Sequence, residues 1–214
     1  MSCVFYLTIW LEDDEEGETL SERYVLAPHK NDAIAQGRRL LGTSVDFGCR
    51  EILDDEWNTH IALQCIQDTL DNLGSDALML FVLKKYPHFI DADLVSEILC
   101  DDFPKSFEFA LHHIPLKDCR ADWIELAVEC QEQKSLQLLL NKGLRDNGVC
   151  LAQACDWGNR ILFEMLYPNS NHHKALKQTK CANLHWIEER LAAEQKQRLE
   201  QHVVLPLRTS QRKI

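Results

Sequence analysis

The chain has 214 residues, of which 45% are hydrophobic and 27% are charged, an ordinary globular composition that excludes wholesale disorder and collagen-like repetition. Its formal net charge of −11 argues against general binding to nucleic acid or to an anionic membrane, because both require clustered cations. No apolar run approaches the ~18 residues that span a bilayer, and no basic leader precedes the first acidic residues, so we expect neither membrane insertion nor a secretory signal.

The first residues predict two strands joined by a strongly acidic loop. Residues 3–11 are dense in β-branched and aromatic residues, and residues 23–27 form a second, shorter run of this kind. Between them lies an acidic loop, defined as Glu12, Asp13, Asp14, Glu15, Glu16 and Glu18. This loop is either a docking or mimicry surface or a solvated hairpin tip.

A helix and a third strand complete this first segment. Asn31 is a good N-cap and Gly42 a good C-cap, so we predict a helix over residues 32–41. Residues 44–53 contain a candidate third strand. Residues 1–55 are therefore predicted to form a small α+β (ββα) unit that packs against the segment that follows.

From residue 60 to 171 the apolar positions repeat. Three segments aligned without gaps, at offsets of 29 and 27 residues, have apolar residues in all six columns. In column order, the three copies contain Val95, Ile98, Leu99, Phe107, Phe109 and Ala110; Ile124, Ala127, Val128, Leu136, Leu138 and Leu139; and Leu151, Ala154, Cys155, Phe163, Met165 and Leu166. A fainter fourth copy lies 28 residues before the first, and in it the polar residues Gln67 and Asp71 occupy two of the six columns. Each copy predicts a helix, a turn and a second helix, whose apolar stripes are buried only when neighbouring pairs stack.

Residues 127–143 and 151–166 resemble the centre of an ankyrin repeat. They have its paired small residues and its apolar second helix; Gly143 follows the second helix, and Gly158 lies between the helices. Unlike ankyrin repeats, no copy has the Thr-Pro-Leu-His opening, and Gln131 replaces the inter-helix glycine in the middle copy. The resemblance implies a mainly α chain with an ankyrin-like helical-repeat solenoid over residues 60–171.

The C-terminal segment, residues 172–214, is predicted to form a capping helix and a loose tail. A partial apolar stripe runs through residues 183–203 among many charged residues. A helix of this kind covers the exposed end of a solenoid. The alternative is a helix that docks into a partner's groove or pairs as a coiled coil.

Nine cysteines, an odd number without a CxxC motif, indicate reduced thiols in a cytoplasm-like compartment rather than a disulfide framework. Adjacent histidines, as in His112-His113, point in different directions on a helix, so no metal site is predicted.

Phosphate-binding, zinc-hydrolase and serine-hydrolase motifs are absent, and we therefore predict no catalytic residue and no cofactor. Many Cys–His pairs are conceivable in space, but none is favoured by the local sequence, and an unrecognised enzyme is the least favoured hypothesis.

We expect a non-catalytic protein–protein interaction module: an adaptor, an inhibitor or, by analogy with short ankyrin-like chains, a bacterial accessory or effector protein. We expect the partner to be a protein of unknown identity rather than nucleic acid. The sequence does not indicate the oligomeric state of the chain. The expected location is the cytoplasm, or a host cytoplasm if the chain is an effector. The predicted partner contacts lie at repeat ends and connectors: Trp123, Arg145, Asp146, Trp157 and His172.

The alternative function is an acidic mimic of nucleic acid that inhibits a DNA- or RNA-handling protein. Residues 1–110 contain 22 acidic and 8 basic residues, a net charge of −14. A phosphate mimic needs regularly spaced charges, since a duplex carries one charge per ~1.7 Å of axis. Here the acids gather in the acidic loop and are otherwise scattered as on a solvated helical face. We therefore rank this function second.

Overall fold

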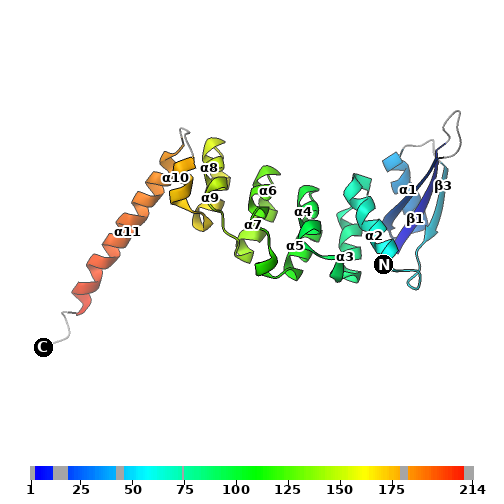
Figure 1. Cartoon of the computed structure of the whole chain (residues 1–214), viewed down its shortest axis with the longest axis horizontal. Coiled ribbons are helices and arrows are strands. Elements are labelled where there is room, and N and C mark those ends of the chain that lie inside the picture. Colours follow the sequence, from blue (N-terminus) through cyan, green and yellow to red (C-terminus); the bar gives the residue numbers. More distant parts are fainter. Residues whose placement is uncertain (1–2, 12–18, 42–45, 74, 179–182, 210–214) are drawn as a thin grey trace. The chain divides into compact units, whose positions relative to one another are not determined.

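The computed structural model describes residues 3–11, 19–41, 46–73, 75–178 and 183–209. Over these residues the chain is mainly helical, with eleven α-helices and one three-stranded antiparallel sheet (Figure 1). The prediction of a mainly helical chain with a small sheet is thereby confirmed. Internal contacts divide the chain into two compact units, Met1–Leu139 and Leu140–Ile214, at a different place from the predicted segment boundaries. None of the described helices is both long and apolar enough to cross a membrane.

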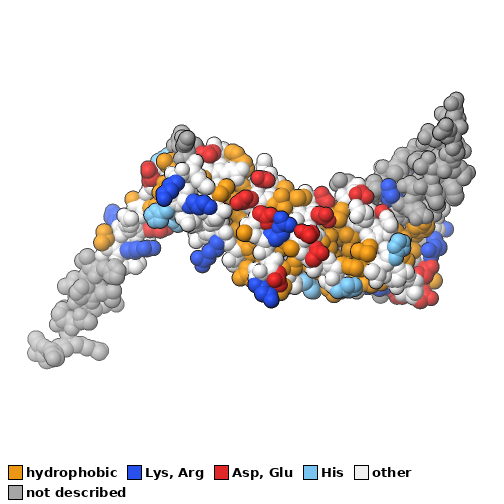
Figure 2. Space-filling model, viewed as in Figure 1, with side chains coloured by type: hydrophobic (Ala, Val, Ile, Leu, Met, Phe, Trp, Pro, Cys, Tyr) orange, Lys and Arg blue, Asp and Glu red, His pale blue; other side chains and the backbone are white. Residues whose placement is uncertain are grey.

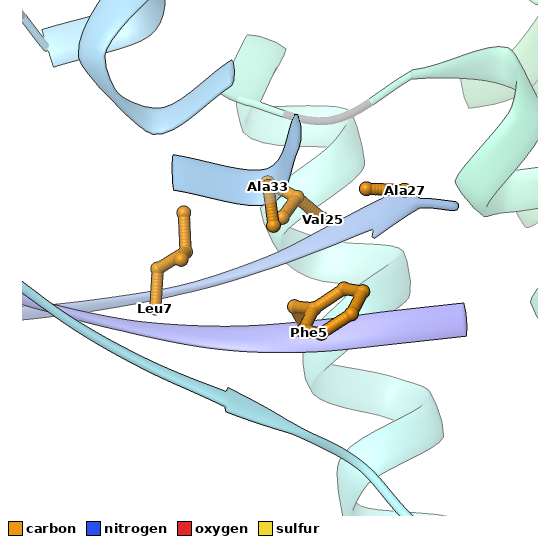
Figure 3. Close-up of a cluster of buried hydrophobic side chains, with 5 residues drawn as sticks. All are labelled: Phe5, Leu7, Val25, Ala27 and Ala33. Carbon is orange, nitrogen blue, oxygen red and sulfur yellow. The ribbon is translucent and has the colours of Figure 1, made fainter. Parts of the chain in front are cut away.

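The sheet consists of β1 (Cys3–Leu11), β2 (Thr19–Ala27) and β3 (Asp46–Glu51), in the order β2-β1-β3. Helix α1 (Lys30–Leu41) packs on one face. Alternate residues of a strand point to opposite faces. Phe5 and Leu7 of β1 therefore share a face, where they form a buried cluster with Val25, Ala27 and Ala33 (Figure 3). All three predicted strands and the predicted helix are present, and β2 begins four residues earlier than predicted.

The rest of the first unit consists of paired helices. Its helices are α2 (Thr59–Asp68), α3 (Asp76–Lys85), α4 (Ala92–Cys100), α5 (Pro104–His113), α6 (Trp123–Glu129) and α7 (Gln133–Lys142), the last of which crosses the boundary between the units. A π-helical turn, Thr69–Leu73, follows α2, and short 3-10 turns, Pro87–Phe89 and Leu116–Asp118, precede α4 and α6. Helix α3 packs against α5, and α4 packs against α5 and α6 (Figure 1).

One turn geometry recurs between the helices of a pair. Asp102, Gln131 and Gly158 have φ angles of 54°, 59° and 64°, in the left-handed region. They are separated by 29 and 27 residues, the offsets at which the apolar columns align. In each case the next residue donates its backbone N–H to a carbonyl five residues back, with N···O distances of 3.3, 2.9 and 2.9 Å in chain order. This 6→1 bond and the left-handed residue define a Schellman turn, which ends the first helix of each pair.

The apolar columns are buried in all three copies. In each copy five of the six positions lie in the core, and only the fifth is half-buried: Phe109, Leu138 and Met165. In the fourth copy Met79 and Val82 are buried, whereas Gln67 and Asp71 are exposed. The polar residues in the fourth copy therefore face water, as their chemistry requires.

Hydrogen bonds between side chains join successive helix pairs in the first unit. The Asp76 carboxylate accepts bonds from the backbone N–H and the hydroxyl of Ser106, at 2.9 and 2.6 Å. Nε1 of Trp123 donates to Oγ of Ser96 at 2.8 Å. Because Trp123 and Ser106 are both fully buried, these bonds satisfy polar groups that water cannot reach.

A buried carboxylate connects α2 to the sheet. Asp68, 2% exposed, accepts the backbone N–H of Tyr24 at 3.2 Å and the amide of Gln64 at 3.2 Å. Burial raises the pKa of Asp68, because a charged carboxylate loses its hydration there, and these hydrogen bonds offset part of that effect.

The second unit contains α8 (Val149–Asp156), α9 (Arg160–Leu166), α10 (His172–Gln178) and α11 (His185–Thr209), with a 3-10 turn at Tyr167–Asn169. Helix α8 packs against both α9 and α10. The start of α11 packs on α9, where Trp186 lies edge-on to Phe163 and the guanidinium of Arg160 lies 4.9 Å from both ring centres.

Candidate interaction surface

The predicted contact residues divide into buried and accessible ones. Trp123 and Asp146 are buried in the core. Trp123 is 0% exposed, and its ring packs between helices of the first unit. Asp146, 5% exposed, precedes α8, and its carboxylate accepts the backbone N–H groups of Cys150 and Leu151, each at 3.1 Å. The prediction that these two side chains contact a partner is therefore corrected, because neither is accessible and both have partners within the fold.

The backbone of Asp146 also joins the segment before α8 to the segment before α10. Its N–H donates to the carbonyl of Asn169, and its carbonyl accepts the N–H of Asn171, both at 3.1 Å. Gly148, two residues later, has a φ of 103°, and a Cβ there would lie 2.5 Å from the carbonyl oxygen of Asn171. Only glycine fits such an approach of two backbones.

The remaining predicted residues lie at the surface to different degrees. Arg145 is exposed, and His172 is half-buried. The ring of His172 stacks on Tyr167 at 4.0 Å, and its Nε2 lies 2.6 Å from the Tyr167 carbonyl oxygen. Because one ring face and one ring nitrogen of His172 already have contacts inside the unit, His172 has less accessible surface for a partner than Arg145 has.

Trp157 is the predicted contact residue that has a large apolar side chain exposed to water. It is the C-cap of α8, where its backbone N–H donates to Gln153 at 2.9 Å, and its side chain is 50% exposed. Ile161, on the first turn of α9, is 61% exposed. The left-handed Gly158 lies between them. We call Trp157 and Ile161 the turn surface; it presents an aromatic and an aliphatic side chain on either side of a tight turn.

A group of half-buried rings belongs to the first unit and was not predicted as a site. The ring of Trp57 lies 5.6 Å from Phe81 and 6.3 Å from Tyr86, and Nζ of Lys85 lies 4.9 Å from its centre. Asp54 accepts a 2.8 Å hydrogen bond from Lys85, which lowers the pKa of this aspartate. Residues 54 and 57 lie in the loop before α2, whereas residue 81 lies in α3 and residue 86 follows it, so no local pattern could have grouped them. Since the rings largely cover one another and the cation is already paired, this cluster is a surface packing feature.

Other features of the described residues favour no particular chemistry. No group of three or more His, Cys, Asp or Glu side chains there is placed to hold a metal ion. The acidic loop lies outside the described residues. On the face shown in Figure 2, acidic and basic side chains are mixed over α4 to α6, as on a solvated surface. Comparisons with protein-family models, curated proteins and solved structures find no match to this chain.

Proposed function

We propose that the chain is a non-catalytic protein–protein interaction module, an adaptor or inhibitor, built as an ankyrin-like stack of helix pairs. The recurrence of one Schellman turn at offsets of 29 and 27 residues supports a repeated unit. So do the contacts between successive pairs of the first unit, which join residues 27 to 30 apart, such as Ser96 with Trp123 and Asp76 with Ser106. In this proposal the first turns of α11, which pack on α9, cap the final pair.

The observation that carries the interaction role is the turn surface. An indole that is 50% exposed and an isoleucine that is 61% exposed, on either side of one turn, leave apolar area in water that a partner can cover. Tryptophan and arginine dominate binding hot spots because they combine large apolar faces with polar donors. We therefore assign Trp157 and Ile161 as the principal contacts and the exposed Arg145 as a polar contact. Trp123 and Asp146 are left out.

The test starts with capture of binding proteins from an extract of the producing cells, followed by calorimetric titration with the purified candidate. We expect Trp157→Ala to weaken binding at least tenfold, which corresponds to about 1.4 kcal/mol. The matched control is Leu116→Ala, since Leu116 is 51% exposed but belongs to the first unit. Equal losses in the two variants, or unchanged binding by a folded Trp157→Ala protein, would contradict the proposed surface.

A further inference from the structure

Helices α4 and α6 lie side by side in the first unit (Figure 1), and pairs of side chains connect them. Near their N-terminal ends Arg120 forms an ion pair with Asp93 at 3.1 Å. One turn further along, Trp123 donates to Ser96. At their C-terminal ends Cys100, the last residue of α4, and Cys130, the C-cap of α6, lie close enough for the two thiols to influence each other. The helices therefore run parallel, and the two cysteines form the last of three successive contacts.

Both cysteines are accessible as well as adjacent. Cys100 is the last residue of α4, Cys130 is the C-cap of α6, and both side chains are exposed. Cys65, Cys150 and Cys155, by contrast, are buried in the apolar core. The fold thus brings two exposed thiols of neighbouring helix pairs together while enclosing three others.

We propose that Cys100 and Cys130 form an intramolecular disulfide under oxidising conditions and so lock α4 to α6. With hydrogen peroxide as the oxidant, one thiolate attacks a peroxide oxygen, giving a sulfenic acid and one water after protonation. The second thiolate attacks the sulfenic sulfur, forms the S–S bond and releases a second water. Two thiols lose two protons and two electrons in all, and peroxide is reduced to two waters.

The surroundings of the pair set the conditions for this reaction. Burial, the neighbouring Cys130 thiol, and the carboxylates of Asp101 and Glu97 raise the pKa of Cys100. Because the thiolate is the nucleophile, oxidation is slow at neutral pH and faster in mildly alkaline buffer. A thiol of raised pKa is also a poor leaving group, so the disulfide resists reduction once it has formed. The pair is therefore a locking device and not a rapidly cycling redox centre.

The lock has a measurable effect on stability. The disulfide closes a loop of about 30 residues that includes α5 and the connector to α6, which restricts the unfolded chain. We expect the thermal midpoint of unfolding to rise on the order of 5–10 °C on oxidation and to return when dithiothreitol is added.

The experiment treats the full chain with hydrogen peroxide in mildly alkaline buffer and maps cysteines by mass spectrometry of a non-reducing digest. The expected result is a monomer in which the peptides containing Cys100 and Cys130 are linked and two thiols are lost. Cys100→Ser and Cys130→Ser each abolish the linked peptide and the thermal shift, whereas Cys119→Ser, a control in the connector between α5 and α6, preserves both. Links between chains only, another dominant pairing, or sulfinic acid at Cys100 without a link would overturn the proposal, and the wild-type map alone decides among these outcomes.

Discussion

In the first unit, Met1–Leu139, successive helix pairs are joined by buried side-chain hydrogen bonds, whereas the helices of the second unit, Leu140–Ile214, are held by backbone pairing and contacts between rings. Ser96 with Trp123 represents the first type of contact. The bridge of Asp146 to Asn169 and Asn171 represents the second, together with Phe163 and Trp186. The same Schellman turn occurs in both units, so the turn defines the helix pair while the contacts around it vary.

The two units also differ in the residue that takes the left-handed position of that turn. It is Asp102 or Gln131 in the first unit and Gly158 in the second. An L-residue with a Cβ pays a steric cost there that glycine avoids, while glycine loses more chain entropy on folding. Substitutions at the contacts between helices and at the left-handed turn residues can therefore test this difference between the units.

The largest effect is expected at Trp123 of the first unit. Trp123→Ala removes a fully buried indole and leaves Ser96 without its donor, so we expect a loss of about 3–5 kcal/mol in the free energy of unfolding. Urea denaturation followed by circular dichroism measures it. Trp123→Phe, which keeps most of the ring, should lose less than Trp123→Ala. A loss below about 1 kcal/mol for the alanine variant would show that the contact with Ser96 is not structural.

A somewhat smaller effect is expected from Gly148→Ala in the second unit. The new Cβ would lie 2.5 Å from the Asn171 carbonyl oxygen at a φ of 103°, and we expect a loss of roughly 2–3 kcal/mol. Gly158→Ala is the control, since a Cβ there would lie 3.5 Å from Nδ2 of Asn183, an ordinary contact. Thermal unfolding should rank Gly148→Ala as the more damaging change, and the reverse order would contradict the close approach of α10.

Exchanging the turn residues between the units should shift stability by about 0.5–1 kcal/mol in opposite directions. Gln131→Gly relieves the left-handed strain in the first unit and should stabilise it, whereas Gly158→Gln introduces that strain in the second unit and should destabilise it. Urea midpoints of the two variants, compared with the wild type, provide the measurement. Shifts of the same sign would refute a shared turn geometry.

A smaller, pH-dependent effect is expected at Glu132. Burial first, and then the charge of Asp102 and a hydrogen bond to it, raise the pKa of Glu132. A carboxyl whose folded-state pKa is raised lowers stability as the pH increases from its unfolded pKa through its folded pKa. The stability of Glu132→Gln relative to the wild type should therefore grow as the pH rises above about 4, the usual pKa of a free glutamate. Asp102→Asn should reduce the same dependence, and a pH-independent difference would speak against the carboxyl pair.

The smallest effect on stability is expected for Trp157→Ala. Its side chain is half in water, so the free energy of unfolding should change by no more than about 0.5 kcal/mol. Chemical denaturation beside Trp123→Ala provides a direct comparison of two tryptophan truncations. A large loss would mean that Trp157 supports the fold, and the proposed surface would then need revision.

Much of the helical pattern could be predicted because apolar periodicity reports burial directly. The columns from Val95 to Leu166 are buried except for the fifth position of each copy. The location of Trp123 was less evident, although it precedes Ala127 by four residues and so shares its buried face. Asp146 was also open to a capping interpretation, since it lies just before α8 in an Asp-Asn-Gly sequence.

Contacts between distant segments could not be predicted in this way. Cys100 and Cys130 are 30 residues apart in the sequence, and their proximity depends on how α4 packs against α6. The cluster around Trp57 draws on a loop, α3 and the residue that follows it. Periodicity identifies the face on which a residue lies, whereas the neighbour that it meets depends on how helices pack.

The bond from Tyr24 to Asp68 has a consequence for association between copies of the chain. The edge of a sheet offers unsatisfied amides to which another strand can add, and such edges promote aggregation unless they are covered. On the outer edge of β2, α2 packs against the strand and the Asp68 carboxylate occupies the amide of Tyr24. Helix α2 thus protects this edge of the sheet against strand addition, and removing the Asp68 carboxylate would expose the edge to another strand as well as weaken the fold.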